Sequence, residues 1–305
     1  MKLYGLLNSA AQKKSIQQPG GDIMATIMNG AKVAREFRED IARLVGLKGE
    51  LGKAAPVLAV IYVGNNKASE RYVNNKEKDC VECGIECRLI HLEEDSTTND
   101  IAKVIDGLNN DDTVDGIILQ LPLPEHCDEL ELVNKIKPDK DMDKLSVLSA
   151  GALRLRGTHN YAPCTPLGIM MLLRDYDIDP AGKTCVIIGR SNLVGLPLAS
   201  LMTSADATVT VCHSKTPDLA RHCREADILV SAAGKQCLVT ADMVKDGAVV
   251  IDVGINVNED GKLCGDVCFD EVAEKASYIT PVPGGVGPMT RAMLLLQVVS
   301  KAYNL

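Results

Sequence analysis

Residues 186–195 read Val186-Ile187-Ile188-Gly189-Arg190-Ser191-Asn192-Leu193-Val194-Gly195. The β-branched run predicts a buried strand, and the glycines after it predict a tight turn into a helix. Gly189 would permit the turn, and Gly195 would let the helix approach the strand closely. The helix N-terminus would then offer free N–H groups to a pyrophosphate. Because Ser191 replaces the middle glycine of the usual motif, an ordinary strand–turn–helix is the alternative, but we interpret the stretch as a dinucleotide-binding turn.

The next expected strand favours NADP over NAD. NAD-binding folds place an Asp or Glu about 20 residues after the first glycine, where it holds the ribose hydroxyls. Here that region contains no acid and reads Val211-Cys212-His213-Ser214-Lys215-Thr216. A carboxylate would repel a 2′-phosphate, whereas Ser214, Lys215 and Arg190 could bind one. Taken alone, Lys215 is equally compatible with a solvated surface charge.

Strands and helices alternate outward from this turn in both directions. Apolar runs bounded by Gly or Pro predict strands at 57–63, 86–92, 116–121, 184–188, 208–211, 228–231 and 249–253. Apolar positions at helical spacing predict helices at 30–52, 68–83, 98–109, 129–136, 167–175, from about 196, and at 289–302. Such alternation predicts parallel sheets that are covered by helices on both faces.

We therefore expect an α/β protein of two domains with a cleft between them. Residues 29–160 and 286–305 would form a substrate-binding catalytic domain, and residues 161–285 a Rossmann-like NADP-binding domain. Residues 1–28 resemble a loose leader, since Gln, Pro and Gly gather at 17–21 and no long apolar run follows Lys2.

Charge and cysteine content exclude several classes of function. The formal net charge is −8, which argues against nucleic-acid binding, and no stretch is long and apolar enough to span a membrane. Eleven cysteines cannot all pair within one chain. Cys80 and Cys83 have no matching pair at zinc-finger distance, so we expect no metal site. Reduced thiols that pack as small apolar residues predict a cytoplasmic protein.

Four segments of the first domain and the C-terminal region carry candidate chemistry. Tyr72 and Lys76 lie four residues apart and would share a helix face, although such pairs also decorate solvated helices. Gln120 would end a strand, at the edge of the sheet where ligands bind. Asp143 follows Pro138 in a loop, where its carboxylate could accept two N–H bonds from a pterin-like ring. Pro281 to Pro288 is dense in turn-forming residues and would bring bare backbone close to a ligand.

Together these segments resemble the bifunctional methylenetetrahydrofolate dehydrogenase/cyclohydrolase family. The resemblance runs from about Asn29 to the C-terminal helix. It rests on segments at 72–76, 115–124, 138–143, 163–168, 189–197, 213–216, 252–256 and 280–290. The most specific segment is Thr280-Pro281-Val282-Pro283-Gly284-Gly285-Val286-Gly287-Pro288-Met289-Thr290.

The resemblance implies roles for matching residues. Lys76 would be the catalytic lysine, Gln120 would position it, and Asp143 would hold the pterin edge. Tyr72 would stack on the folate, and the rest of the folate pocket would come from Leu119, Leu121, Pro283, Gly284, Gly285, Val286 and Gly287. The expected NADP contacts are Gly189, Arg190, Ser191, Ser214 and Ile255. It also implies tetrahydrofolate substrates, a place in one-carbon metabolism and purine biosynthesis, and a homodimer formed through the cofactor domain.

The implied reaction has two steps. A hydride passes from the methylene carbon of 5,10-methylenetetrahydrofolate to NADP⁺, and water then opens the methenyl product to 10-formyltetrahydrofolate. A lysine suits the second step because a neutral amine accepts a proton whereas an ammonium does not. Burial against Leu119 and Leu121 would favour the neutral form.

One position departs from the family. Lys144 follows Asp143 where the family usually has glycine, so a positive φ there would be strained. Three other functions remain open: a monofunctional dehydrogenase, a shikimate- or amino-acid-type dehydrogenase, and a catalytically silent NADP-binding sensor.

Overall fold

The computed structural model describes residues 24–155 and 161–305, and the chain divides into two compact units. Of the described residues, the first unit contains 35–152 and 291–305, and the second contains 24–34, 153–155 and 161–290. Three helices run from one unit into the other along the chain: α2 (Gly30–Gly46), α6 (Val147–Leu153) and α11 (Val286–Tyr303).

A parallel sheet in the order β3-β2-β4 forms the centre of the first unit. Its elements are β2 (Val57–Val63), α3 (Lys67–Glu82), β3 (Glu86–Leu92), α4 (Thr98–Asn110), β4 (Gly116–Leu119) and α5 (Glu129–Lys135). Val57 is paired with Glu86 and Leu58 with Gly116. Each strand is followed by a helix, which is the connection that parallel strands require.

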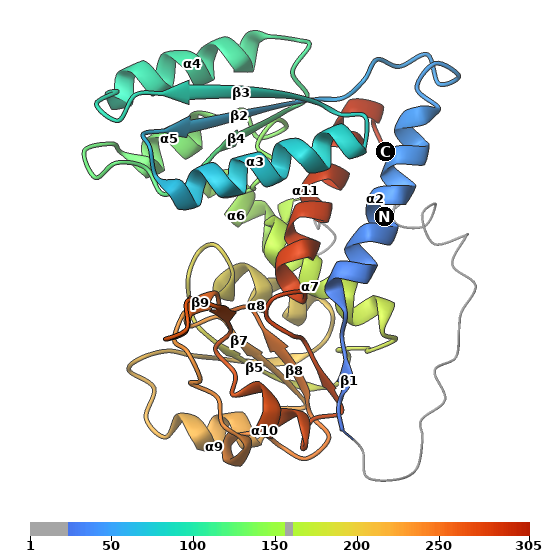
Figure 1. Cartoon of the computed structure of the whole chain (residues 1–305), viewed down its shortest axis with the longest axis vertical. Coiled ribbons are helices and arrows are strands. Elements are labelled where there is room, and N and C mark those ends of the chain that lie inside the picture. The colour runs from blue at the N-terminus through green and yellow to red at the C-terminus, as the bar shows by residue number, and fades with distance from the viewer. Residues whose placement is uncertain (1–23, 156–160) are drawn as a thin grey trace. The chain divides into compact units, whose positions relative to one another are not determined.

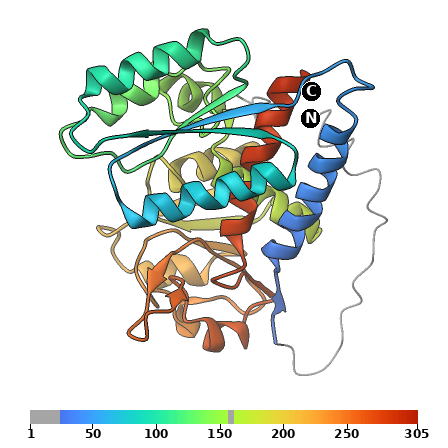
Figure 2. The ribbon, with the colours of Figure 1, turned by 45° about the horizontal axis from the view of Figure 1, so that its top comes forward.

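Side chains alternate between the two faces of this sheet. Val57, Ala59, Ile61 and Val63 pack in one core with buried residues of α4 and α5, and α3 lies along the other face (Figures 1 and 2). β4 follows the same rule, so Leu119 enters the α4–α5 core and Gln120, one residue later, points to the side of α3.

A six-stranded parallel sheet in the order β1-β11-β8-β7-β5-β6 forms the centre of the second unit. Its strands are β1 (Thr26–Ile27), β5 (Thr184–Ile188), β6 (Thr208–Cys212), β7 (Ile228–Ser231), β8 (Val249–Asp252) and β11 (Tyr278–Ile279). A separate antiparallel hairpin joins β9 (Asn256–Val257) and β10 (Leu263–Cys264). The remaining elements are α7 (Cys164–Asp175), α8 (Gly195–Ser204), α9 (Leu219–Arg224), the 3₁₀ helix η2 (Ala241–Met243) and α10 (Phe269–Ala273).

The strand order of the second unit reverses at β5. From there the chain moves outward to β6 and then back across to β7. α9 and α10 pack on one side of the sheet through a shared core, whereas α8 contacts α7, β5 and β6 (Figure 1). This is a doubly wound, Rossmann-like arrangement, in which ligands bind beyond the carboxyl ends of the strands at the point of reversal.

The expected α/β class with two domains and parallel sheets is confirmed. Four strands match the predicted bounds: β2, β3, β5 and β7. Thr26–Ile27, at the end of the segment that we expected to be a leader, form β1 and pair with β11; residues 1–23 lie outside the described part. In the described part, none of the helices has the length and apolar character to cross a bilayer.

Candidate functional site

The first unit joins Lys76 to Gln120 directly. Lys76 lies on α3, and its Nζ donates a hydrogen bond to Gln120 Oε1 over 2.9 Å. Gln120 Nε2 donates to the carbonyl of Leu121 at 2.7 Å, and its backbone N–H donates to Ile61 O at 2.8 Å. The side-chain amide is therefore fixed with its oxygen toward Lys76, and 44 residues of sequence separate the two partners.

Asp143 is a second, charged neighbour of Lys76. Burial raises the pKa of the Asp143 carboxyl, and the positive charge of Lys76 opposes that rise, while Asp141 adds to it. A carboxyl group, an amine and an amide thus converge from a loop, a helix and a strand end. This arrangement can bind a polar ring edge and move a proton beside it.

The loop that carries Asp143 is held in place by Asp141, which the sequence did not single out. The Asp141 carboxylate is buried and accepts hydrogen bonds from Lys144 N at 2.8 Å, Ser149 Oγ at 3.3 Å and Ser146 N at 3.4 Å. The signal in the sequence is an Asp that precedes two serines at the start of a helix, a pattern typical of local side-chain bonding to backbone.

The preceding residues fasten the same loop to the sheet. Ile117 N donates to Lys140 O at 2.7 Å, and Met142 N donates to Ile117 O at 3.2 Å, so the loop runs beside β4. Lys140 Nζ, almost fully buried, donates to the carbonyls of Leu108 and Asp111 near the end of α4. Lys140 is therefore a structural lysine rather than a candidate for proton transfer.

Lys144 adopts the positive φ that we expected to be strained, at +56°. It does not extend into solvent, since only 8% of it is exposed. Its Nζ donates to the carbonyl of Pro138 at 3.2 Å. The loop therefore keeps the backbone conformation that glycine would favour and accommodates the longer side chain by burying it.

Three remaining folate candidates differ in exposure. Tyr72 lies one helical turn before Lys76 and is 45% exposed, so its ring is available for stacking. Leu119 is buried, and Leu121 packs against the same core on the α4–α5 face of the sheet. The expectation that these two leucines bury Lys76 is wrong, because strand alternation turns them to the opposite face from Gln120.

The last folate candidates, Pro283 to Gly287, belong to the second unit and lead into α11. Gly284 has a φ of +105°, and its carbonyl accepts a hydrogen bond from Ala31 N at 2.8 Å. A Cβ on Gly30 would lie 2.0 Å from Gly285 O. The segment is thus a tight turn packed against the first residues of α2.

The expected cofactor turn follows β5 as the motif predicts. Gly189 has a φ of +118°, and a Cβ there would lie 2.3 Å from Ala232 O. A Cβ on Gly195 would lie 2.0 Å from Gly189 O, which explains why the helix can begin so close to the turn. Ser191 stands where the usual motif has its middle glycine, and its Oγ accepts a hydrogen bond from Val194 N at 3.2 Å.

The candidate phosphate ligands gather at the carboxyl ends of two neighbouring strands. Ile188 and Cys212 are paired as the last residues of β5 and β6, and Gly189 N donates to Cys212 O at 2.9 Å. Arg190, Ser191 and Ser214 follow these ends and are exposed, as is Lys215. Since residues 211–216 contain no acid, the cradle suits a 2′-phosphate on the adenosine ribose.

Ile255, the last expected cofactor contact, follows β8 and is 56% exposed. Its neighbours are held by two buried carboxylates that sequence reasoning missed. Gly254 N donates to Asp252 at 2.9 Å, and Asn256 Nδ2 donates to Asp266 at 3.0 Å.

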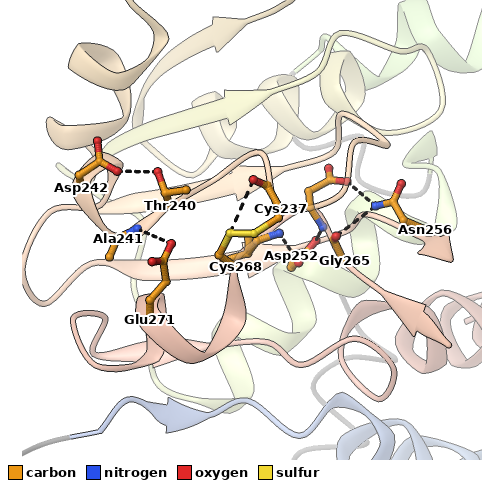
Figure 3. The surroundings of a disulfide bond; sticks show 11 residues. Cys237, Thr240, Ala241, Asp242, Asp252, Asn256, Gly265, Cys268 and Glu271 are labelled. Atoms are coloured by element: carbon orange, nitrogen blue, oxygen red, sulfur yellow. Dashed lines mark hydrogen bonds between the residues drawn. A yellow bond between two sulfur atoms is a disulfide. The ribbon is translucent and has the colours of Figure 1, made fainter. Parts of the chain in front are cut away.

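The cysteines depart from expectation at one pair. We expected reduced thiols throughout, but Cys237 and Cys268 form a disulfide with their Cα atoms 4.6 Å apart (Figure 3). The other nine are thiols. Burial raises the pKa of Cys185 and of Cys223 to about 12, which suits inert packing residues. A separation of 31 residues gave no sequence signal for the pair.

Comparison with known proteins identifies relatives over most of the chain. Residues 28–143 match the family "Tetrahydrofolate dehydrogenase/cyclohydrolase, catalytic domain", and residues 163–304 match its NAD(P)-binding domain. The bifunctional protein FolD of Campylobacter hominis is 51% identical over 274 residues, which cover 90% of this chain and 94% of that protein.

Solved structures agree. The bifunctional FolD enzyme of Campylobacter jejuni is similar with a TM-score of 0.90 and 47% identity, over 92% of this chain and 99% of that chain. The Trypanosoma brucei enzyme was solved with NADP cofactor and an inhibitor. It is similar with a TM-score of 0.87 and 39% identity, over 92% of this chain and 97% of that chain.

Proposed function

The chain belongs to the tetrahydrofolate dehydrogenase/cyclohydrolase family, and we propose that the residues around Lys76 carry out both reactions of that family in one site. The chain is an NADP-dependent methylenetetrahydrofolate dehydrogenase and methenyltetrahydrofolate cyclohydrolase. It oxidises 5,10-methylenetetrahydrofolate and hydrolyses the methenyl product to 10-formyltetrahydrofolate. The observation that carries the assignment of both steps to one site is the hydrogen bond from Lys76 Nζ to Gln120 Oε1, with the Asp143 carboxyl beside it.

Substrate binding falls to Asp143 and Tyr72. The Asp143 carboxylate accepts N–H bonds from the pterin edge, and the exposed ring of Tyr72 stacks on the flat ring system. Leu121 is a further candidate for the folate pocket, whereas Leu119 is buried in the α4–α5 core. The Pro283–Gly287 turn of the second unit remains a proposed folate contact. Bare backbone in that turn suits close approach of a ligand.

Lys76 moves protons in the hydrolytic step. Water attacks the methenyl carbon and loses one proton, which the amine of Lys76 relays. The hydroxyl proton of the adduct then passes to N5 as the bond between that carbon and N5 breaks, and the formyl group stays on N10. Gln120 is a positioning residue, because its oxygen holds Nζ in one place throughout.

NADP is held by the second unit in this proposal, and the residues present fit it. Gly189 lets the turn close on Ala232 O and Gly195 lets α8 begin against Gly189 O, as a dinucleotide-binding turn requires. Arg190, Ser191 and Ser214 surround the strand ends without a carboxylate. When bound, NADP⁺ accepts the hydride that leaves the methylene carbon. Ile255 contacts it from the loop after β8. We also propose the domain roles expected above: folate chemistry in 29–160 with 286–305, and cofactor binding in 161–285.

A second copy of the chain is the proposed partner. β6 is an edge strand of its sheet, and it borders a groove of about 540 Å³ lined by Arg154, Leu196, Ala199, Ser200, Thr203, Ser204, Val209 and Val211. An edge strand beside such a groove suits antiparallel pairing about a two-fold axis. We also propose the cytoplasm as the location, since nine cysteines that are thiols suit a reducing compartment. Labelling of thiols in intact cells with a reagent that crosses the membrane, compared with one that does not, tests this location.

Substitution of Lys76 by methionine tests the proposed site. Lys76→Met keeps the length of the side chain but removes the amine, so hydrolysis of methenyltetrahydrofolate is expected to fall by about a hundredfold or more. NADP⁺ affinity, measured by titration calorimetry, should stay within about twofold of wild type, because Lys76 and the cofactor turn belong to different units. Lys78→Met, on the same helix, is the matched control. Full hydrolytic activity in Lys76→Met would remove Lys76 from the mechanism.

A coupled spectral assay tests the two activities together. We expect methylenetetrahydrofolate to be oxidised faster with NADP⁺ than with NAD⁺ and without build-up of the methenyl compound. Accumulation of that compound would favour a monofunctional dehydrogenase. No reduction of either cofactor would overturn the proposed function.

A further inference from the structure

Two buried carboxylates lie beneath the proposed cofactor site and take part in no step derived above. Asp252 is the last residue of β8, and Asp266 follows β10. Asp266 is fully buried and Asp252 is 4% exposed. Buried carboxylates are costly unless hydrogen bonds compensate them, so their contacts indicate what they hold in place.

Asp266 accepts five hydrogen bonds from the two loops that follow β7 and β8. Three come from successive backbone N–H groups: Ala233 at 2.7 Å and Gly234 at 3.1 Å to Oδ2, and Lys235 at 2.9 Å to Oδ1. Ser231 Oγ donates to Oδ2 at 3.1 Å, and Asn256 Nδ2 donates to Oδ1 at 3.0 Å. One carboxylate therefore fixes the path of residues 231–235 and joins it to Asn256.

Asp252 holds Asp266 and the start of the second loop. Its carboxylate accepts from Asp266 N, Val267 N and Gly254 N, each at 2.9 Å. Glycine is required beside both carboxylates, because a Cβ on Gly265 would lie 1.8 Å from Asp252 Oδ2 and one on Gly254 would lie 2.1 Å from Asp266 Oδ1. Asn256 Nδ2 also donates to Gly265 O at 3.1 Å (Figure 3).

The first of these loops flanks the cofactor turn. A Cβ on Gly189 would lie 2.3 Å from the carbonyl of Ala232, so the first loop closes directly on that turn. In the second loop, the exposed Ile255 stands between Gly254, bound to Asp252, and Asn256, bound to Asp266. A shift of Asp266 would therefore move the loop that borders the turn and, with it, the segment that carries Ile255.

We propose that Asp266 is the positioning residue of the NADP site: it fixes residues 231–235 against the Gly189 turn and joins them to Asn256, and Asp252 holds Asp266 in place. The inference rests on the proposed placement of NADP at that turn. Asp266 touches neither the folate nor the reacting atoms, and it acts through the backbone that it binds.

The test is Asp266→Asn, with NADP⁺ affinity as the main readout. The amide keeps the shape of the carboxylate but replaces one acceptor with a donor that faces N–H groups. Calorimetry should show the Kd for NADP⁺ rising about ten- to a hundredfold, and the KM for NADP⁺ should rise with it. The kcat at saturating NADP⁺ and the hydrolysis of methenyltetrahydrofolate, which consumes no cofactor, should change little.

Two further variants make the result decisive. Asp270→Asn removes an exposed carboxylate four residues away on α10 and should leave NADP⁺ affinity unchanged. Asn256→Ala leaves Asp266 four of its five hydrogen-bond donors and should weaken NADP⁺ binding several-fold. If Asp266→Asn does not fold, the NADP⁺ affinity of Asn256→Ala decides the proposal. Wild-type affinity in Asn256→Ala and in folded Asp266→Asn would overturn the proposal. So would an equal loss of hydrolysis and NADP⁺ binding. A wild-type chain that does not bind NADP⁺ would instead overturn the proposed function.

Discussion

Lys144 combines a left-handed backbone with a buried cation. Its φ of +56° belongs to the region where a Cβ is unfavourable by roughly 1–2 kcal/mol. The hydrogen bond from Lys144 N to Asp141 Oδ1 holds that conformation, and the one from Nζ to Pro138 O anchors the side chain. The strain therefore lies directly after Asp143, in the loop that presents it.

Two substitutions of Lys144 separate its backbone from its side chain. Lys144→Gly and Lys144→Ala both remove the Nζ hydrogen bond, so their difference reports the backbone alone. We expect the glycine variant to be more stable by about 0.5–1 kcal/mol in urea unfolding. The opposite sign is expected at Gly107, in helix α4 with open space at its Cβ position, where alanine should be the more stable residue. Equal stability of the two Lys144 variants would show that the loop carries no such strain.

Asp143 makes folate binding depend on pH. Burial raises its pKa above the usual 3.8, so the carboxylate is lost at a higher pH than for an exposed Asp. A protonated acid cannot accept two N–H bonds, so the KM for folate should rise as pH falls, with a midpoint above 3.8. The NADP⁺ affinity should not follow this curve.

The comparison with Asp143→Asn assigns that midpoint. The amide should weaken folate binding about ten- to a hundredfold at neutral pH. The variant KM should lack the Asp143 acid limb, so the ratio of variant to wild-type KM should fall as pH falls, with the Asp143 midpoint. Titration of the substrate itself cancels in this ratio. An acid limb that persists in the variant would assign the midpoint to another group.

The turn between β5 and α8 is the element whose shape depends most on single atoms. A Cβ at Gly195 would lie 2.0 Å from Gly189 O and 2.7 Å from Gly189 C, both backbone atoms. Gly195→Ala must therefore push the start of α8 away from the turn. We expect NADP⁺ affinity to fall by at least about tenfold, while hydrolysis by the first unit continues. NADP⁺ binding at the wild-type level would show that this turn does not hold the cofactor.

Elements with a regular apolar pattern were predictable from the sequence, and those held by distant partners were not. The bounds of β2, β3, β5 and β7 follow from short apolar runs between Gly and Pro. The β9–β10 hairpin was missed, because Asn256 at its start is fixed by Asp266 rather than by periodicity.

The candidate site shows the same limit. Lys76 and Gln120 lie 44 residues apart, so their direct hydrogen bond could be expected only from the family resemblance. The structural role of Lys140 depends on distant carbonyls that no motif marks. For Asp141 the two following serines were a local signal, which the sequence interpretation did not use. Strand alternation alone could have placed Leu119 away from Lys76, since adjacent residues point to opposite faces.

At the scale of the whole molecule, the open edge at β6 calls for a partner. An edge strand beside a groove favours association, and natural proteins protect such edges by charge or by pairing. Among the described residues that line the groove, half are apolar, three are small and polar, and one, Arg154, is charged. Pairing of two β6 strands would extend the sheet through the dimer and cover both grooves.

A charge in this groove should separate the two copies. Val209 is the second residue of β6 and lines the groove. In a two-fold dimer, the substitution Val209→Lys places two lysines in the interface. Each ammonium group would lose its hydration there, and the described groove residues offer no carboxylate to pair with it. We expect the dissociation constant of the dimer to rise by at least about tenfold. Light scattering at micromolar concentration should then show a lower average mass. Val147→Lys, at an exposed valine of α6, should leave the mass unchanged.

A dimer that survives Val209→Lys would place the interface elsewhere, and a wild-type chain that is monomeric at every concentration would contradict the homodimer. Because the groove and the cofactor turn lie on one Rossmann-like unit, loss of the dimer with unchanged NADP⁺ affinity would show that each unit binds cofactor on its own.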